Sequence, residues 1–157
     1  VCSPSLHGCC LCCTGGTPHS GYRSGTSSAA SASCRSPSHT RISNIVPADP
    51  CLCGVTFLDG EYKEKDVEVE AWKTVKGSYD DTEHVRFRTL PEVTVVSCTC
   101  KGSYAQMSAV NAAILEWIAA TGCCPNGPMF NIYHVSPHET SNPEEFITEV
   151  CYPIEKR

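Results

Sequence analysis

Apolar and polar residues alternate along two segments in the C-terminal third of the chain, residues 129–135 and 146–154. A period of two is typical of half-buried β-strands. In the second segment Glu149 occupies a mid-strand position with apolar residues around it. A carboxylate is costly to bury without a partner. The pattern therefore makes Glu149 the first candidate functional residue.

The same pattern occurs once more, earlier in the chain. Residues 67–75 overlay residues 147–154 so that Glu70 falls on Glu149, and residues 49–57 form the preceding apolar segment. Both pairs of segments are joined by polar connections. An internal repeat of this kind predicts two copies of one module, each carrying a glutamate in the middle of a strand.

A helix is predicted over residues 104–121, between the two pairs of strands. Ser103 is a candidate N-cap, and Gly122 is suited to the C′ position. The apolar positions recur at helical spacing: Met107, Val110, Ile114, Trp117, Ile118 and Thr121. The β-rich run 92–100 before the helix predicts a central strand, and residues 84–90 predict a short exposed one. The order strand, helix, strand, strand indicates an α+β fold with helices on one side of an antiparallel sheet.

Composition changes sharply near residue 48. The preceding residues contain no Asp, Glu or Lys and are rich in Ser, Gly, Thr, Pro and Cys. Such low-complexity sequence cannot bury a core. We therefore expect residues 1–47 to be disordered or anomalous, and residues 48–157 to form the folded domain. A zinc site at Cys9, Cys10, Cys12, Cys13 and His7 does not fit the usual paired-ligand spacing, so no metal or cofactor is expected.

Charge and cysteine usage narrow the class of protein further. The net charge of −5 disfavours direct nucleic-acid contact, which needs clustered Lys and Arg. No apolar run is long enough to span a bilayer, and no secretory signal is recognised. The chain has 13 cysteines, of which Cys98, Cys100 and Cys151 lie in strand-patterned runs as small apolar residues. We therefore expect a cytoplasmic protein in a reducing compartment.

Several motifs together resemble a known family. They are Lys-Gly-Ser-Tyr at residues 101–104, the amphipathic helix, Gly-Pro-x-Phe-x-Ile-Tyr at 127–133, and Asn-Pro-Glu-Glu followed by Thr-Glu-Val-Cys-Tyr-Pro-Ile at 142–154. This set resembles the gyrase-inhibitor-like small-molecule-binding domain over about residues 48–156. The resemblance implies two strand–helix–strand–strand modules around a pseudo-twofold axis, with a ligand groove between them. The first module looks incomplete, because its first strand and helix are not recognised.

The resemblance also implies a function. Such domains form the effector-binding half of bacterial multidrug-responsive transcription regulators, so we expect a lipophilic or cationic effector. We also expect fusion to, or association with, a helix-turn-helix DNA-binding domain. A standalone hydrolase of strained electrophilic compounds is the alternative, with Glu149 and either Tyr104 or Tyr133 as base and acid. A truncated family member without activity is a third interpretation.

Five residues are expected to bind the ligand. Glu149 would meet a cation, and Glu70 would be its counterpart in the repeat or part of a solvated acidic face. Trp72 suits cation–π recognition but equally suits a core. Tyr133 would form a wall of the groove, and Tyr104 would pack across it or cap the helix.

Overall fold

The computed structural model describes residues 9–11, 28–32, 45–59, 67–81, 85–90 and 92–156. Its helical segments are the 3-10 turns η1 (Tyr104–Gln106) and η2 (Pro143–Glu145) and the helix α1 (Met107–Thr121). Its strands are β1 (Cys9–Leu11), β2 (Ser28–Ala32), β3 (Val46–Pro47), β4 (Cys53–Phe57), β5 (Val69–Lys76), β6 (Val85–Thr89), β7 (Val95–Lys101), β8 (Cys123–Pro125), β9 (Phe130–Val135) and β10 (Ile147–Lys156).

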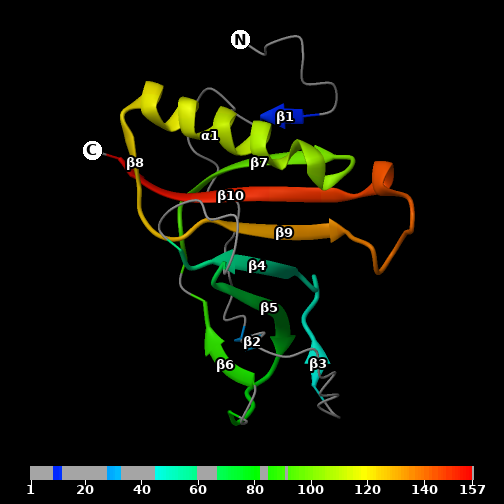
Figure 1. The fold of residues 1–157 in the computed structure, drawn as a ribbon. Coiled ribbons are helices and arrows are strands. Elements are labelled where there is room, and N and C mark those ends of the chain that lie inside the picture. The colour runs from blue at the N-terminus through cyan, green and yellow to red at the C-terminus, as the bar shows by residue number, and fades with distance from the viewer. Residues whose placement is uncertain are drawn as a thin grey trace.

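The strands form one ten-stranded sheet in the order β1-β7-β10-β9-β4-β5-β2-β6, with β3 on β5 and β8 on β10. Every pairing is antiparallel. Figure 1 shows α1 running alongside β7 and β10, near one end of the sheet. The predicted α+β class is therefore confirmed, and β4 and β5 confirm the predicted hairpin.

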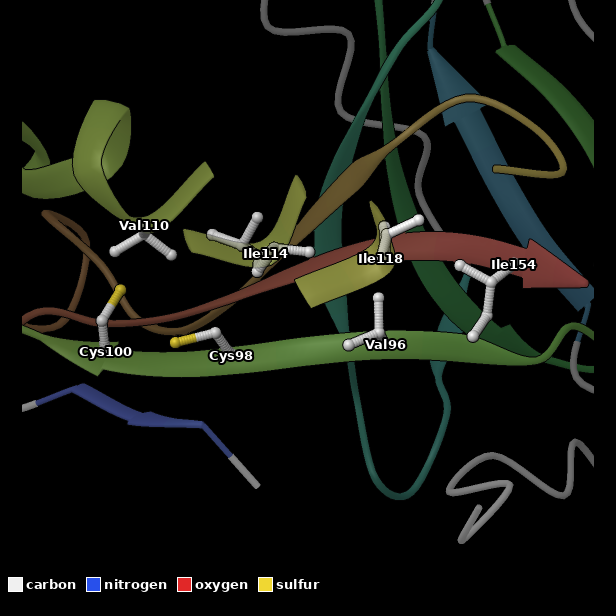
Figure 2. Packing of buried hydrophobic residues seen from close by; sticks show 8 residues of the cluster. Val96, Cys98, Cys100, Val110, Ile114, Ile118 and Ile154 are labelled. Atoms are coloured by element: carbon white, nitrogen blue, oxygen red, sulfur yellow. The ribbon is translucent and has the colours of Figure 1, made fainter. Parts of the chain in front are cut away.

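The helix packs on one face of the sheet, over β7 and β10, and we call this face the helix face. Val110, Ile114 and Ile118 project from α1 onto a layer of strand residues (Figure 2). That layer consists of Val96, Cys98 and Cys100 from β7 and Val150 and Ile154 from β10. Val110 and Ile114 are fully buried, as the predicted stripe requires. Trp117 is only half-buried and Thr121 is exposed, so the stripe is narrower than expected.

The C-terminal end of the helix agrees with the sequence-based prediction better than the N-terminal end does. Gly122 adopts φ 71° at the C-cap, as predicted for a left-handed terminus. At the other end the predicted helix starts as the 3-10 turn η1, and α-helical geometry begins only at Met107. Ser103 is the N-cap of η1, but its side chain makes no capping hydrogen bond. The side chain of Gln106 instead donates to the Lys101 carbonyl at 2.9 Å, close to the start of the turn.

A second, smaller core lies on the opposite face of the sheet. It consists of Trp72, Ile132 and Cys151, from β5, β9 and β10. β4 lies between β5 and β9, and Trp72 crosses it at Gly54. A Cβ atom at Gly54 would lie 2.3 Å from Cζ2 of Trp72, so only glycine leaves room for the indole there. An isolated glycine inside a strand often marks such a close approach.

Two expectations about the first 47 residues remain open. Residues 1–8, 12–27 and 33–44 lie outside the described part of the chain, and with them most of the predicted low-complexity segment and of the cysteine-rich set considered for zinc. Within that segment β1 pairs with β7, and β2 pairs with β5 and β6. The boundary at residue 48 therefore stays a prediction.

Cysteine packing follows the sequence only in part. Cys98, Cys100 and Cys151 are buried, as the strand pattern predicts. Cys98 also forms a disulfide bond, so it contributes a covalent cross-link in addition to packing. Within the described ranges, no helix is long and apolar enough to cross a membrane.

Candidate functional site

The register between β9 and β10 determines which residues lie near Glu149. Glu149 pairs with Ile132, and Cys151 pairs with Phe130. Paired residues of neighbouring strands project to the same side of a sheet, and successive residues alternate. Since Val150 packs under α1, Glu149 projects to the opposite side. We call that side the glutamate face.

Glu149 has an internal partner on this face. Nε2 of His134 lies 2.9 Å from Oε2 of Glu149 and donates to the carboxylate. The side chain of Glu149 is 13% exposed and that of His134 is 34% exposed, so the pair is shielded but reachable from solvent. Burial, reinforced by the nearby Glu149 carboxylate, raises the pKa of the Cys151 thiol. His134, a hydrogen-bond partner of Glu149, thus comes from the neighbouring strand β9.

Glu70, the counterpart of Glu149 in the repeat, has a similar environment. It pairs with Thr56 of β4, which places it on the glutamate face with Trp72. Its carboxylate forms an ion pair with Arg88 of β6, and the two side chains are 16% and 51% exposed. Each of the two repeat glutamates is therefore mostly covered and bonded to a nitrogen-bearing side chain.

Trp72 forms part of the smaller core on this face. Its indole is buried, and Nε1 donates to Oγ1 of Thr56 at 3.1 Å. The ring meets Phe130 edge to face, with centroids 6.2 Å apart. The indole therefore packs in the smaller core, and its part in ligand binding stays a prediction. The indole and Phe130 still give the glutamate face an apolar, aromatic centre beside its two carboxylates.

Tyr133 and Tyr104 lie on the other side of the sheet. Tyr133 pairs with Thr148, and both therefore project to the helix face. Tyr104 meets Tyr133 at 6.0 Å with nearly perpendicular rings, and lies 5.2 Å from Phe146. Burial is the largest cause of the raised pKa of Tyr104, followed by Tyr133 and Glu139. The structure thus separates the five predicted residues into two groups on opposite faces.

This separation bears on the hydrolase alternative. A base and an acid acting on one substrate must both come within hydrogen-bond reach of it. Glu149 and the hydroxyls of Tyr104 and Tyr133 lie on opposite faces, so the described structure does not bring them together. No observation favours that pairing.

Two important residues were not predicted from the sequence, His134 and Gly54. His134 shares the alternation of Phe130 and Ile132, and this is the signal that places it on the glutamate face. Gly54 interrupts an otherwise apolar strand, which signals a close approach of another group. Within the described residues, no cluster of three or more His, Cys, Asp or Glu side chains is arranged to hold a metal ion.

Comparison with known proteins identifies the family of the chain. The chain matches the family described as the GyrI-like small molecule binding domain over residues 27–155. The chain therefore belongs to the GyrI-like family, and the predicted resemblance is confirmed. A comparison with curated protein sequences gives no match.

Solved structures show the same fold at low sequence identity. The EcmrR chain in a cryo-EM structure of its DNA complex superposes with a TM-score of 0.77 and 20% identity, covering 83% of this chain and 55% of EcmrR. The crystal structure of the EcmrR C-terminal domain gives 0.70 and 23%, covering 73% of both chains. An uncharacterized conserved protein from Listeria innocua gives 0.54 and 18%, covering 71% of this chain and 65% of that one. The chain thus spans little more than half the length of the EcmrR chain bound to DNA.

Proposed function

We propose that this domain binds a lipophilic cation on the glutamate face, with Glu149 as the acid that selects the charge. The pair of Glu149 and His134, in which the carboxylate is only 13% exposed, carries the proposal. At 4 Å two opposite charges attract by about 1 kcal/mol in water and about 4 kcal/mol near a protein surface. A shielded carboxylate therefore distinguishes a cation from a neutral compound far better than a solvated one.

His134 has a defined part in this proposal. When no ligand is bound, its imidazole satisfies the Glu149 carboxylate through one hydrogen bond of 2.9 Å. A cationic ligand replaces that bond with its own charge, and the more exposed His134 side chain turns toward solvent. The aromatic centre formed by Trp72 and Phe130 supplies apolar contact for the body of the ligand.

We also propose that the domain acts as the effector-binding part of a transcription regulator. Membership of the GyrI-like family and likeness to EcmrR, which was solved in complex with DNA, support this role. The −5 net charge disfavours DNA contact by the domain itself. A separate DNA-binding domain, fused or associated, would make that contact.

The strand order supports a two-module arrangement as part of the same proposal. In one half of the sheet β10 lies between β7 and β9, and in the other β5 lies between β2 and β4. In each set the last strand in sequence is the middle one, and β9 and β4 meet where the sets join. A pseudo-twofold axis between β9 and β4 would relate the two sets and bring Glu70 and Glu149 to the same face.

The test uses a cation and its neutral parent, N-methylacridinium and acridine, titrated by fluorescence under conditions where acridine is uncharged. A charge-assisted hydrogen bond is worth about 1.5–3 kcal/mol. Glu149→Gln should therefore weaken N-methylacridinium binding by about tenfold or more, and acridine binding much less. His134→Ala should strengthen cation binding, because Glu149 loses one competing partner.

The matched control is Glu116→Gln, an exposed carboxylate on α1. This variant should bind both dyes as the unaltered protein does. If Glu149→Gln and Glu116→Gln bind N-methylacridinium equally well, Glu149 is not the selecting acid and the proposal fails.

A further inference from the structure

The pair of His134 and Glu149 contains one group that changes its charge near neutral pH. Nε2 of His134 lies 2.9 Å from Oε2 of Glu149, and the two side chains are 34% and 13% exposed. A histidine ordinarily takes up a proton near about pH 6.5, and a glutamate near about pH 4.3. Between these values such a pair has no net charge, and at higher pH it has a net negative charge.

A β-bulge in β9 directs the histidine of this pair. Val135 pairs with Ile147 and Tyr133 pairs with Thr148, so the register between β9 and β10 shifts by one residue and His134 is the extra residue. A bulge re-aims a side chain, and bulges are frequent beside functional sites. The backbone of β9 therefore helps to point the imidazole at the carboxylate on β10.

Other ionisable groups of the described residues surround the pair on β7, on β10 and in the turn after β9: Lys101, Cys151, His138 and Glu139. Three of them are exposed to solvent, which weakens their effect on the pair. Burial raises the pKa of the Cys151 thiol, which therefore stays neutral. β4, the other neighbour of β9, adds no ionisable group at its paired positions. Farther along the same face, Glu70 and Arg88 form their own ion pair.

We propose that the domain binds its cationic effector in competition with a proton, and that His134 is the group that takes the proton. This inference rests on the cation binding at Glu149 proposed above. When His134 is neutral, an approaching cation meets the net negative charge of the pair. When His134 is protonated, the imidazolium offsets the charge of Glu149 at 2.9 Å and repels the cation. The site then no longer favours a charged ligand over a neutral one.

This competition predicts the size of the pH dependence. If the cation binds only when the histidine is neutral, its apparent affinity is proportional to the neutral fraction. For a histidine of ordinary acidity this fraction falls about tenfold between about pH 8 and about pH 5.5. An ordinary glutamate is still more than about 90% ionised at the lower pH. Loss of the glutamate charge therefore contributes little to the fall.

The test titrates the protein with N-methylacridinium by fluorescence at about pH 8 and about pH 5.5, at constant ionic strength. The neutral comparison is the carbon isostere 9-methylanthracene, because acridine itself takes up a proton in this range. We expect the affinity for N-methylacridinium to fall about tenfold at the lower pH. The affinity for 9-methylanthracene should stay constant. A constant affinity for N-methylacridinium would overturn the coupling.

Two substitutions of histidine assign the proton. His134→Gln removes the titrating group and keeps an N–H that can donate to Glu149, so its affinity for N-methylacridinium should be equal at the two pH values. The matched control is His138→Gln, at an exposed histidine in the turn after β9, which should keep the tenfold fall. A fall that persists in His134→Gln would show that another group takes the proton.

Proton release tests the same coupling in the unaltered protein. Coupling between two ligands is reciprocal, so binding of N-methylacridinium should expel the proton from His134. At about pH 6 we expect about three-quarters of a proton per bound dye, and at about pH 8 almost none, measured by calorimetry in buffers of different ionisation enthalpy. Absence of proton release at the lower pH would overturn the coupling.

Glu149→Gln at about pH 8 separates this inference from the proposed function, because His134 is neutral there. Weaker N-methylacridinium binding in this variant, together with a pH-independent affinity in the unaltered protein, would leave the proposed function standing and overturn the coupling alone. Unchanged binding in Glu149→Gln at about pH 8 would overturn both.

Discussion

The indole of Trp72 lies across Gly54, so that the Cζ2 atom of the ring lies only 2.3 Å from where a Cβ atom at that residue would be. This contact lets Trp72 of β5 reach Ile132 and Cys151, which lie beyond β4. The smaller core and the aromatic centre of the glutamate face both depend on the absence of one methyl group.

Gly54→Ala should therefore destabilise the domain. Its Cβ would lie 2.3 Å from Trp72 Cζ2 and 2.6 Å from the Asn131 carbonyl oxygen, and the backbone oxygen cannot easily move away. Overpacking of this kind costs about 1–3 kcal/mol, measurable by urea denaturation. Adding Trp72→Leu should cost less in the Gly54→Ala background than in the unaltered protein, since the ring clash is already relieved. Equal costs in the two backgrounds would show that the ring and the glycine are independent.

Two adjacent helix residues test the position of the main core. Ile114, on the side of α1 that faces the sheet, is fully buried, whereas Leu115 is 46% exposed. Ile114→Ala should lower the free energy of unfolding by about 2–5 kcal/mol, and Leu115→Ala by less than about 1 kcal/mol. Denaturation of both variants under the same conditions measures the difference. A larger loss for Leu115→Ala would place the wrong side of α1 against the sheet.

Thr148→Val should stabilise the protein, unlike most substitutions. Oγ1 of Thr148 is buried without a hydrogen-bond partner among the described residues, and the residue is only 1% exposed. A buried unsatisfied polar atom costs about 1–3 kcal/mol, and valine has nearly the same shape as threonine. We expect a gain of about 1 kcal/mol in thermal or urea unfolding. A loss instead would reveal a partner for the hydroxyl, such as a buried water.

Stability should fall at alkaline pH, and Cys151 should account for part of the fall. Burial raises the pKa of Cys151 in the folded protein, while in the unfolded chain a thiol ionises near pH 8.5. Above that pH the unfolded state binds fewer protons than the folded state, so the free energy of unfolding decreases as pH rises. One thiol contributes a slope of up to about 1.4 kcal/mol per pH unit.

The measurement compares urea unfolding of the unaltered protein and Cys151→Ala from neutral to alkaline pH. The variant loses some stability at every pH because its side chain is smaller. Its decline above the ordinary thiol pKa should be shallower, since one ionising group has been removed. Parallel declines would show that Cys151 ionises equally in both states.

The sequence predicted individual elements well, but not how they face one another. Alternation gave the two faces of β9 and of β10 separately, because it depends only on neighbouring residues. Whether Glu149 meets His134 or Tyr133 depends on the register between the strands, and a shift of one residue exchanges the faces. The expected grouping of Glu149 with Tyr133 needed that register, and the sequence does not contain it.

The boundary of the domain shows the same limit. Low-complexity composition favours a core that begins near residue 48, whereas the family match begins at residue 27 and β2 at Ser28. Composition cannot show a short strand whose partners are far away in sequence. Limited proteolysis distinguishes the two, because a stable fragment that retains β2 would place the boundary before residue 28, and one that starts near residue 48 would confirm the composition.

The place of β10 also has a consequence for how the protein folds in the cell. β10 follows β7 and β9 in the chain but lies between them, and the two earlier strands pair with it rather than with each other (Figure 1). While the ribosome is still translating residues 136–146, β7, α1 and β9 have already been made. The edges of β7 and β9 that will pair with β10 then have no partner strand. Open strand edges invite association with other chains. This half of the sheet therefore closes late, and a nascent chain paused before β10 is the form that most needs a chaperone.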